Sequence, residues 1–166
     1  MDLLAAAVPV RVVEWYQKLI RMVGWKLSAM APASSAISNL IMSDQGKQDV
    51  RRSNCCVMDC GRQGVRLYFY QKGLLFAKRG LEFCDTEERL LFELEKIWDY
   101  YQICYPGYIP ELIYVTGGKR NPLLEAAITE RLEAECCDWT KLLDNSQEPV
   151  RGLISAEAAG MTFWKG

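Results

Sequence analysis

The sequence predicts an α/β fold in which a mixed sheet, containing a three-stranded antiparallel meander, is flanked by helices. One indication is the stretch 54–83, where three strand patterns are joined by two short turns that contain glycine. Another is the alternation of helix, strand, helix and strand patterns over residues 85–143. The chain has 166 residues, half of them hydrophobic, and is therefore long enough to bury a full core.

The first residues predict a strand followed by a helix. Leu3–Val8 is apolar throughout, as in a buried strand, and Pro9 stands where a helix begins. Apolar residues then recur at helical spacing over Val12–Val23, and Gly24 ends this helix because it can adopt a left-handed conformation.

A second strand and helix are expected before the meander. Residues 25–30 predict a short strand, and the pair Ser34–Ser35 is expected to cap a helix over residues 36–42. The polar segment 44–53, which contains Gly46, is the predicted linker.

The meander is predicted from its hydrophobic pattern. The continuous apolar run Cys55–Met58 is typical of a strand buried on both faces, and Gly61 and Gly64 bound the turn that follows it. A second turn at Gln71–Gly73 leads into a third strand, 74–83. The middle strand alternates as if one face were inward, with Val65, Leu67 and Phe69 opposite Arg66, Tyr68 and Tyr70.

The rest of the chain predicts helix, strand, helix and strand. Asp85 and Glu88 resemble a capping box, and the helix that follows is stopped by Pro106–Gly107. A strand over 111–116 runs into two glycines, after which Asn121 as cap and Pro122 begin the next helix. A last strand over 136–143 and a closing helix over 155–165 are also expected.

Composition excludes several classes of function. The net charge of −1 argues against a nucleic-acid-binding protein, because such proteins need a basic face. The chain contains no histidine, which excludes Ser-His and Cys-His mechanisms and leaves carboxylates, lysine or a bound metal-nucleotide for any chemistry. The apolar stretch Leu3–Val10 is too short to span a membrane, and it lacks the basic flank of a signal peptide.

The seven cysteines predict core thiols rather than a metal site. The adjacent pairs Cys55–Cys56 and Cys136–Cys137 do not have the spacing of zinc ligands, and the chain contains no Cys-x-x-Cys. We expect reduced, buried thiols, as in a protein of the reducing cytosol.

The first candidate site is the turn DCGRQG, residues 59–64. The carboxylate of Asp59, at the end of a strand, can hold a magnesium-bound water. The turn formed by Gly61, Arg62 and Gln63 can direct backbone N–H groups at a phosphate. The alternative is an ordinary hairpin turn, in which such glycines also occur.

The second candidate site lies at the end of the strand 111–116. Gly117 and Gly118 would let an anionic ligand approach the backbone, and the helix start adds partial positive charge. The pair Lys119–Arg120 could face a bound phosphate. The alternative is a plain loop with solvated charges. We expect this loop and the Asp59 turn to converge on one crevice.

The predicted order of elements is that of a ribonuclease H-like lobe, which also builds each half of the actin-like ATPases. The segment VMDCGRQGVRLYFYQKGLLFAKRG resembles their second phosphate loop, and ELIYVTGGKRNPLLEAAITERL resembles their adenosine loop and the following helix. The chain resembles the PilM group of type IV pilus assembly proteins, with FtsA and type II secretion platform proteins as relatives. In this resemblance, residues 1–43 end the first lobe, 44–53 form a linker and 54–166 form the second lobe.

The resemblance implies a cytoplasmic protein at the inner face of the membrane, without a membrane span of its own and without nucleic acid. Its implied partner is the cytoplasmic tail of a membrane-anchored pilus or secretion platform protein. The implied cofactor is ATP with magnesium, and Asp59 would hold the metal through a water. The implied cofactor-binding residues are Asp59, Gly61, Arg62, Gln63, Gly117, Gly118 and Lys119.

The chain departs from the family pattern in two ways. Nothing precedes Met1 that could supply the first phosphate loop, so we expect either a fragment or a protein that has dispensed with half of the cleft. Gln63, Gly64 and Val65 follow the Asp-x-Gly turn in place of the family's hydroxyl residues. Hydrolysis by this chain alone is therefore not expected, and nucleotide binding is expected to be weak or lost.

Three functions remain to be compared. The leading one is an interaction component of a pilus or secretion platform, and the alternative is a magnesium-dependent ATPase domain. A ribonuclease H-like nuclease would need several acids on two metal ions, for which Asp59 and Glu87 or Glu88 are candidates. The nuclease is disfavoured because the strand 111–116 carries its only acid, Glu111, at its start.

Overall fold

A computed structural model of the chain describes residues 7–27, 30–42, 50, 52–82, 86–142 and 161. Contacts divide the chain into two compact units, residues 1–32 with 166, and residues 33–165. The helix over 33–42 belongs to the second unit, although the sequence prediction assigned it to the first segment. The predicted lobe and linker boundaries stay a prediction.

The first unit contains helix α1, Val10–Met22. Pro9 is its N-cap, and Gly24, with φ of 76°, follows its end, so the helix predicted here is confirmed. Residues 25–27 and 30 are not in a strand, so the strand predicted over 25–30 is wrong for these residues. The strand predicted over Leu3–Val8 falls mostly outside the described residues, and Val8 is exposed coil.

The second unit contains a five-stranded mixed sheet with the order β3-β2-β1-β4-β5. β1 pairs with β2 and β2 with β3 in antiparallel fashion, so the predicted meander is confirmed. β4 runs parallel to β1 on its other side, and β5 runs parallel to β4. The strands are β1 Asn54–Cys60, β2 Gly64–Gln71, β3 Leu74–Glu82, β4 Leu112–Thr116 and β5 Glu135–Asp138.

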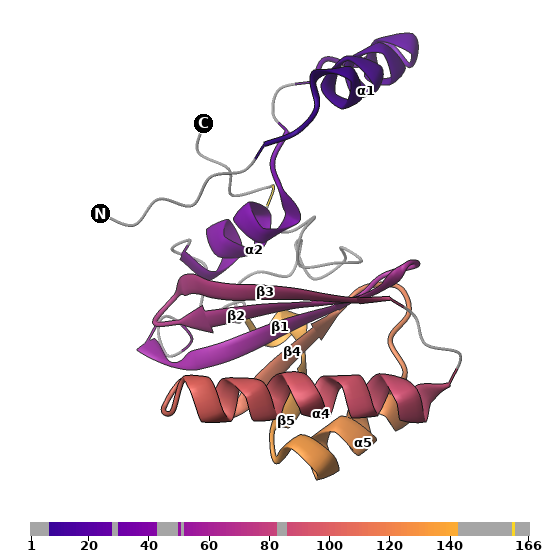
Figure 1. Cartoon of the computed structure of the whole chain (residues 1–166). Coiled ribbons are helices and arrows are strands. Elements are labelled where there is room, and N and C mark those ends of the chain that lie inside the picture. The colour runs from indigo at the N-terminus through magenta and orange to yellow at the C-terminus, as the bar shows by residue number, and fades with distance from the viewer. Residues whose placement is uncertain are drawn as a thin grey trace. The chain divides into compact units, whose positions relative to one another are not determined.

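Helices cover both faces of this sheet (Figure 1). Helices α4, Glu87–Cys104, and α5, Pro122–Leu132, pack on one face, and α2, Ala33–Met42, packs on the other. Successive residues of β1 point to opposite faces, so Cys56 belongs to the core under α4 and Cys55 to the core under α2. β1 is therefore buried on both faces, as predicted.

The second face of β2 is buried as well, which corrects the prediction of a strand with one inward face. Tyr68 and Tyr70 are buried because α2 covers them. The hydroxyl of Tyr70 donates to the carbonyl oxygen of Ser34 at 3.2 Å. Ser34 itself lies inside α2, so the predicted cap at Ser34–Ser35 is wrong.

The observed starts of α4 and α5 lie at or within one residue of the predicted caps. The N-cap of α4 is Thr86, one residue after the predicted Asp85, and its Oγ1 accepts the N–H of Arg89 at 3.3 Å. Asp85 lies outside the described residues. Asn121 caps α5 as predicted, because its Oδ1 accepts the N–H of Leu123 at 3.0 Å.

Three further predictions concern the less regular segments. The predicted strand 136–143 is too long, because β5 ends at Asp138 and a short 3-10 helix, η1, follows over Trp139–Leu142. Within the predicted linker, Val50 is buried in the core under α2. The helix predicted over 155–165 lies outside the described residues except for Met161, which is helical.

Candidate functional site

The ends of β1 and β4 bring the two predicted loops together. Asp59 pairs with Thr116 in the parallel register, so the chain leaves both strands at the same edge of the sheet. Gly117 has a φ of 96°, and a Cβ added there would lie 2.5 Å from the carbonyl oxygen of Cys60. The same Cβ would lie 2.8 Å from Oδ1 of Asp59. The loops therefore touch, and Gly117 is required for that approach.

Two backbone donors that could have served a phosphate are used within the loops themselves. The N–H of Lys119 donates to the carbonyl oxygen of Cys60 at 3.0 Å, and this bond ties the two loops together. The N–H of Gly61 donates to the carbonyl oxygen of Gly64 at 3.0 Å and closes the hairpin turn. A ligand at this edge would have to be held by other groups.

The carboxylate of Asp59 lies near a cation in a largely buried position. Asp59 is 8% exposed, and its Oδ2 is 3.6 Å from Nη1 of Arg66, its partner across β1 and β2. Burial, together with the negative charge of Asp59, raises the pKa of the neighbouring Cys60 thiol to about 12. Cys60 is therefore a protonated core thiol at neutral pH and is not poised as a nucleophile.

A hollow opens beside the hairpin turn. It is lined by residues 61–66 of the turn and by Gly80, Leu81 and Glu82 at the end of β3. Three predicted site residues, Gly61, Arg62 and Gln63, therefore face a common space, whereas the lining does not include Gly117, Gly118 or Lys119.

Two of the predicted glycines are not required by packing. A Cβ at Gly118 would meet nothing within 4 Å. A Cβ at Gly61 would come no closer than 3.5 Å to any atom, and its second neighbour would be Oδ2 of Asp59 at 3.9 Å. Gly61 therefore leaves room for ligand atoms beside the carboxylate, and Gly118 leaves open space in the second loop. In this respect the residues fit a nucleotide and its magnesium, although the fit is incomplete because the N–H groups of Gly61 and Lys119 are already bonded.

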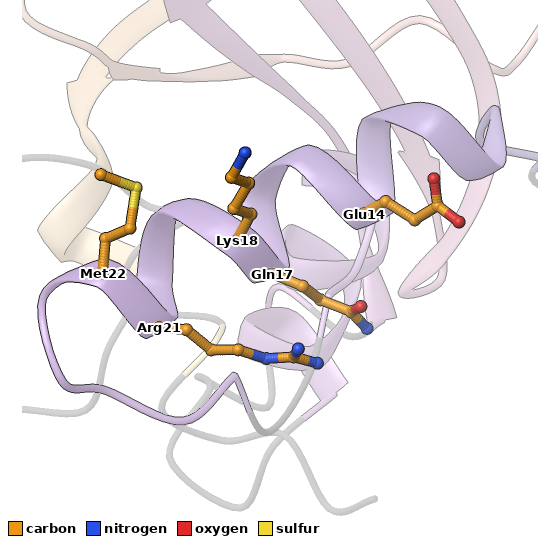
Figure 2. A pocket seen from close by; sticks show the side chains of 5 residues that line it. All are labelled: Glu14, Gln17, Lys18, Arg21 and Met22. Carbon is orange, nitrogen blue, oxygen red and sulfur yellow. The ribbon is translucent and has the colours of Figure 1, made fainter.

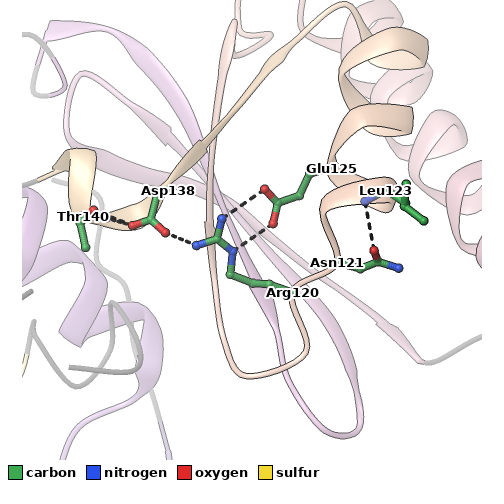
Figure 3. A network of polar contacts seen from close by, with 6 residues as sticks. All are labelled: Arg120, Asn121, Leu123, Glu125, Asp138 and Thr140. Atoms are coloured by element: carbon green, nitrogen blue, oxygen red, sulfur yellow. Dashed lines mark hydrogen bonds and ion pairs between the residues drawn. The ribbon is translucent and has the colours of Figure 1, made fainter. Parts of the chain in front are cut away.

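Arg120 is engaged by carboxylates of the protein itself (Figure 3). Its guanidinium lies between two carboxylates, with bonds of 2.9 and 3.2 Å to Glu125 and a further ion pair to Asp138. Arg120 therefore joins the start of α5 to the end of β5. Sequence reasoning missed this network, whose only local signal is the Arg120–Glu125 spacing across the start of a capped helix.

Asp138 is further fixed by Thr140. Its Oδ1 accepts the N–H of Thr140 at 2.8 Å and the Oγ1 hydroxyl at 2.6 Å. Partial burial works to raise the pKa of Asp138, but the hydrogen bonds from Thr140 and Arg120 outweigh it, so that the pKa is lowered. The carboxylate is thus ionised and committed to this network at neutral pH.

The described residues contain no group of three or more acidic or cysteine side chains that could hold a metal ion. Of the acids considered for a nuclease, Glu87 accepts a hydrogen bond from Nδ2 of Asn121, and Glu88 is exposed at the start of α4. A two-metal site formed by these acids and Asp59 is therefore not supported.

A second, shallow hollow lies along α1 in the first unit (Figure 2). It is lined by Glu14, Gln17, Lys18, Arg21 and Met22 and contains none of the predicted site residues. Among the helices that the structure describes, none has both the length and the apolar character needed to cross a bilayer.

Comparison with known proteins identifies the fold. Neither a protein-family model nor a curated protein matches the chain. A chain of the PilM-PilN type IV pilus biogenesis complex is similar, with a TM-score of 0.66 and 16% identity over 91% of this chain and 56% of that one. The ethanolamine utilization protein EutJ from Carboxydothermus hydrogenoformans is also similar, with a TM-score of 0.57 and 13% identity over 93% of this chain and 62% of EutJ.

The chain spans only 56% and 62% of the lengths of these two proteins. At such low identity the likeness concerns the backbone architecture: the mixed five-stranded sheet with its antiparallel meander and its flanking helices. The chain therefore has the PilM-like, actin-like ATPase fold that its sequence predicted.

Proposed function

We propose that this chain is an actin-fold interaction component of a type IV pilus assembly platform, or of a related type II secretion platform, at the cytoplasmic face of the inner membrane. The observation that carries the proposal is the fold likeness to a chain of the PilM-PilN complex, which extends over 91% of this chain. The proposed partner is the cytoplasmic tail of a membrane-anchored platform protein. In this role the chain binds another protein and turns over no substrate.

The site geometry supports an interaction role over an ATPase role. The backbone N–H groups of Gly61 and Lys119 are bonded within the loops, and the carboxylate of Asp59 lies 3.6 Å from Arg66. No hydroxyl residue follows the Asp-x-Gly turn. Phosphate affinity depends on several donors converging on one ligand, so any nucleotide is expected to bind weakly.

The test is isothermal titration of the full chain with a peptide that carries the cytoplasmic tail of a platform protein. A scrambled peptide of the same composition is the control, because it matches the net charge but not the sequence. Saturable heat with the tail and none with the scrambled peptide is the expected result. The absence of heat from the tail, with the protein folded by circular dichroism, would overturn the proposal.

A magnesium-dependent ATP-binding domain is the second candidate. The observation that favours it is the contact of the Asp59 carboxylate with the Gly117 loop, beside two glycines, Gly61 and Gly118, that packing does not require. Asp59 would hold magnesium through a water, and Arg62, Gln63 and Lys119 would lie near the phosphates. The nucleotide would supply a transferable phosphoryl group.

Titration with ATP and magnesium tests this candidate. Asp59→Asn removes the proposed metal-water ligand, and Gly118→Val puts a branched side chain into the space that is open around a Cβ at this position. Both substitutions should abolish the heat of binding, whereas Glu88→Gln, a change of an exposed carboxylate on α4, should leave it unchanged. Equal heats for the original chain and Asp59→Asn would remove Asp59 from the site.

A further inference from the structure

Helix α1 has a polar side and a broad apolar side, and none of its side chains is buried. Its sequence repeats apolar residues at intervals of three or four, the spacing of one helix face. The apolar side consists of Val12, Val13, Trp15, Tyr16, Leu19 and Ile20. The polar side consists of Arg11, Glu14, Gln17, Lys18 and Arg21, of which the last four line the hollow in Figure 2.

The apolar side is exposed to an extent that is unfavourable in water. Trp15 is 58% exposed and Leu19 is 43% exposed. Trp25, three residues beyond the helix, is 71% exposed. A helix of 13 residues is marginal in water without tertiary support, so contact of this side with an apolar phase would stabilise it.

The charges of this segment indicate what kind of surface it meets. Between Val10 and Lys26 there are four basic side chains, Arg11, Lys18, Arg21 and Lys26, against the single acid Glu14, although the whole chain has a net charge of −1. This segment therefore has a net charge of +3, and the rest of the chain has a net charge of −4. Such a segment is attracted to an anionic surface, and a basic side chain can extend its alkyl stem along the apolar side while its charge stays in water.

We propose that α1 binds the surface of an anionic lipid bilayer and lies in the plane of the interface. Its apolar side would enter the boundary between headgroups and acyl chains, and its basic residues would contact the lipid phosphates. Trp15 and Trp25 suit this location, because tryptophan is enriched where water meets the acyl chains. The inference deepens the proposed function, since it rests on peripheral placement at the membrane, but it requires no protein partner.

The test is sedimentation of the full chain with two kinds of vesicle. One contains phosphatidylcholine alone, and the other contains phosphatidylcholine and phosphatidylglycerol in equal parts. The chain is expected to sediment with the anionic vesicles, to a degree that falls as salt is added, and not with the neutral ones. Tryptophan fluorescence should shift to the blue on binding. The measurement uses the Trp164→Phe chain, because Trp164 lies outside the described residues. The shift then reports on Trp15 and Trp25, since Trp98 and Trp139 are already buried.

Matched substitutions localise the binding to α1. Leu19→Asp places a charge within the apolar side and should weaken partitioning by about tenfold or more. Leu123→Asp makes the same change at a leucine of α5 that is 76% exposed, and it should have no effect. Arg11→Gln and Lys18→Gln should each weaken partitioning by about fivefold, because each removes one basic charge.

The outcomes are distinct. Binding to anionic vesicles that is lost in Leu19→Asp and kept in Leu123→Asp supports the proposal. No binding to anionic vesicles, or equal binding by the original chain and Leu19→Asp, overturns it. The titration with the platform tail is carried out without lipid, so the interaction function and the membrane-binding helix can fail independently.

Discussion

The carboxylate of Asp59 and the backbone of Gly117 are in direct contact across the β1–β4 pair. A Cβ added at Gly117 would lie 2.8 Å from Oδ1 of Asp59. The next glycine, Gly118, is different, because a Cβ there would meet nothing within 4 Å. Of these two adjacent glycines, only Gly117 therefore lacks a side chain because of a close approach.

Gly117→Ala is expected to lower the free energy of unfolding by about 2–4 kcal/mol, since it adds left-handed backbone strain to a collision with the carbonyl of Cys60. Gly118→Ala should change it by less than about 0.5 kcal/mol. Urea denaturation followed by circular dichroism measures both. Equal effects of the two substitutions would contradict the contact described here.

Gly64 lies at another close approach, between the hairpin turn and β3. A Cβ at Gly64 would lie 2.0 Å from the carbonyl oxygen of Leu81, whereas one at Gly80 would meet nothing within 4 Å. Gly64→Ala should therefore destabilise the protein by about 3 kcal/mol or more, and Gly80→Ala should be nearly neutral. Thermal unfolding of the pair tests this. A Gly64→Ala protein as stable as Gly80→Ala would show that the turn can relax.

Arg120 and Arg131 provide a comparison between a partly buried and an exposed arginine. Arg120→Met removes the bonds to Glu125 and Asp138 and should cost about 2 kcal/mol, because two carboxylates lose their cation. Arg131 lies 3.3 Å from Glu95 at an exposed position, and Arg131→Met should cost less than about 1 kcal/mol. Chemical denaturation measures the loss of unfolding free energy, which should be larger for Arg120→Met than for Arg131→Met at both low and high salt.

The lowered pKa of Asp138 predicts a dependence of stability on pH. A carboxyl whose pKa is lower in the folded protein stabilises the fold above its ordinary pKa of 3.8, and that contribution is lost as pH falls through the folded value. Asp138→Asn should therefore be less stable than the original chain by a constant amount near neutral pH. The difference in unfolding free energy should shrink below about pH 4. If this difference in unfolding free energy grew below pH 4, the pKa of Asp138 would be raised in the folded protein and not lowered.

The cysteines should differ in reactivity toward alkylating reagents. Burial raises the pKa of Cys55 and of Cys60 to about 12 and raises the pKa of Cys56 well above its ordinary value, whereas Cys104 is exposed. Iodoacetamide should modify Cys104 in the native protein and leave the three β1 thiols unmodified until urea is added. Peptide mass spectrometry reads the labelled positions. Labelling of Cys60 at the rate of Cys104 would show that this strand opens in the native state.

The sequence predicted those elements whose signal is local. The apolar spacing of α1 and α4 and the Asn121–Pro122 start of α5 are each set by a few neighbouring residues, and the structure confirms them. The Asp59 turn and the Gly117 loop were predicted to converge on one crevice. The parallel pairing of β1 and β4 explains why they meet, because parallel neighbours end at the same edge of a sheet, but the hollow beside the turn is not lined by the second loop.

The predictions that were wrong depended on distant partners. The burial of Tyr68 and Tyr70 is caused by α2, which lies more than 25 residues earlier in the chain. The alternating pattern within β2 does not indicate that a helix covers its second face. The ion pair of Arg120 depends on Asp138, which β5 brings close. The sequence around an arginine does not show whether its side chain forms an ion pair with a residue far along the chain. The cap at Thr86 was missed because Asp85 beside it is an equally good capping residue.

The register that sets Asp59 beside Thr116 also makes the length of β1 a determinant of the core below the site. Asp59 shares a side of the sheet with Cys55 and Val57, under the face that α2 covers. Adding or deleting one residue within Asn54–Met58 would leave Asp59 opposite Arg66, because the turn at 61–63 fixes the register of the hairpin. The β1 side chains that precede the change would instead turn to the opposite face of the sheet. A single-codon insertion or deletion in this part of the gene would therefore keep the contact between Asp59 and Gly117 and exchange the side chains that β1 buries under α2 and under α4.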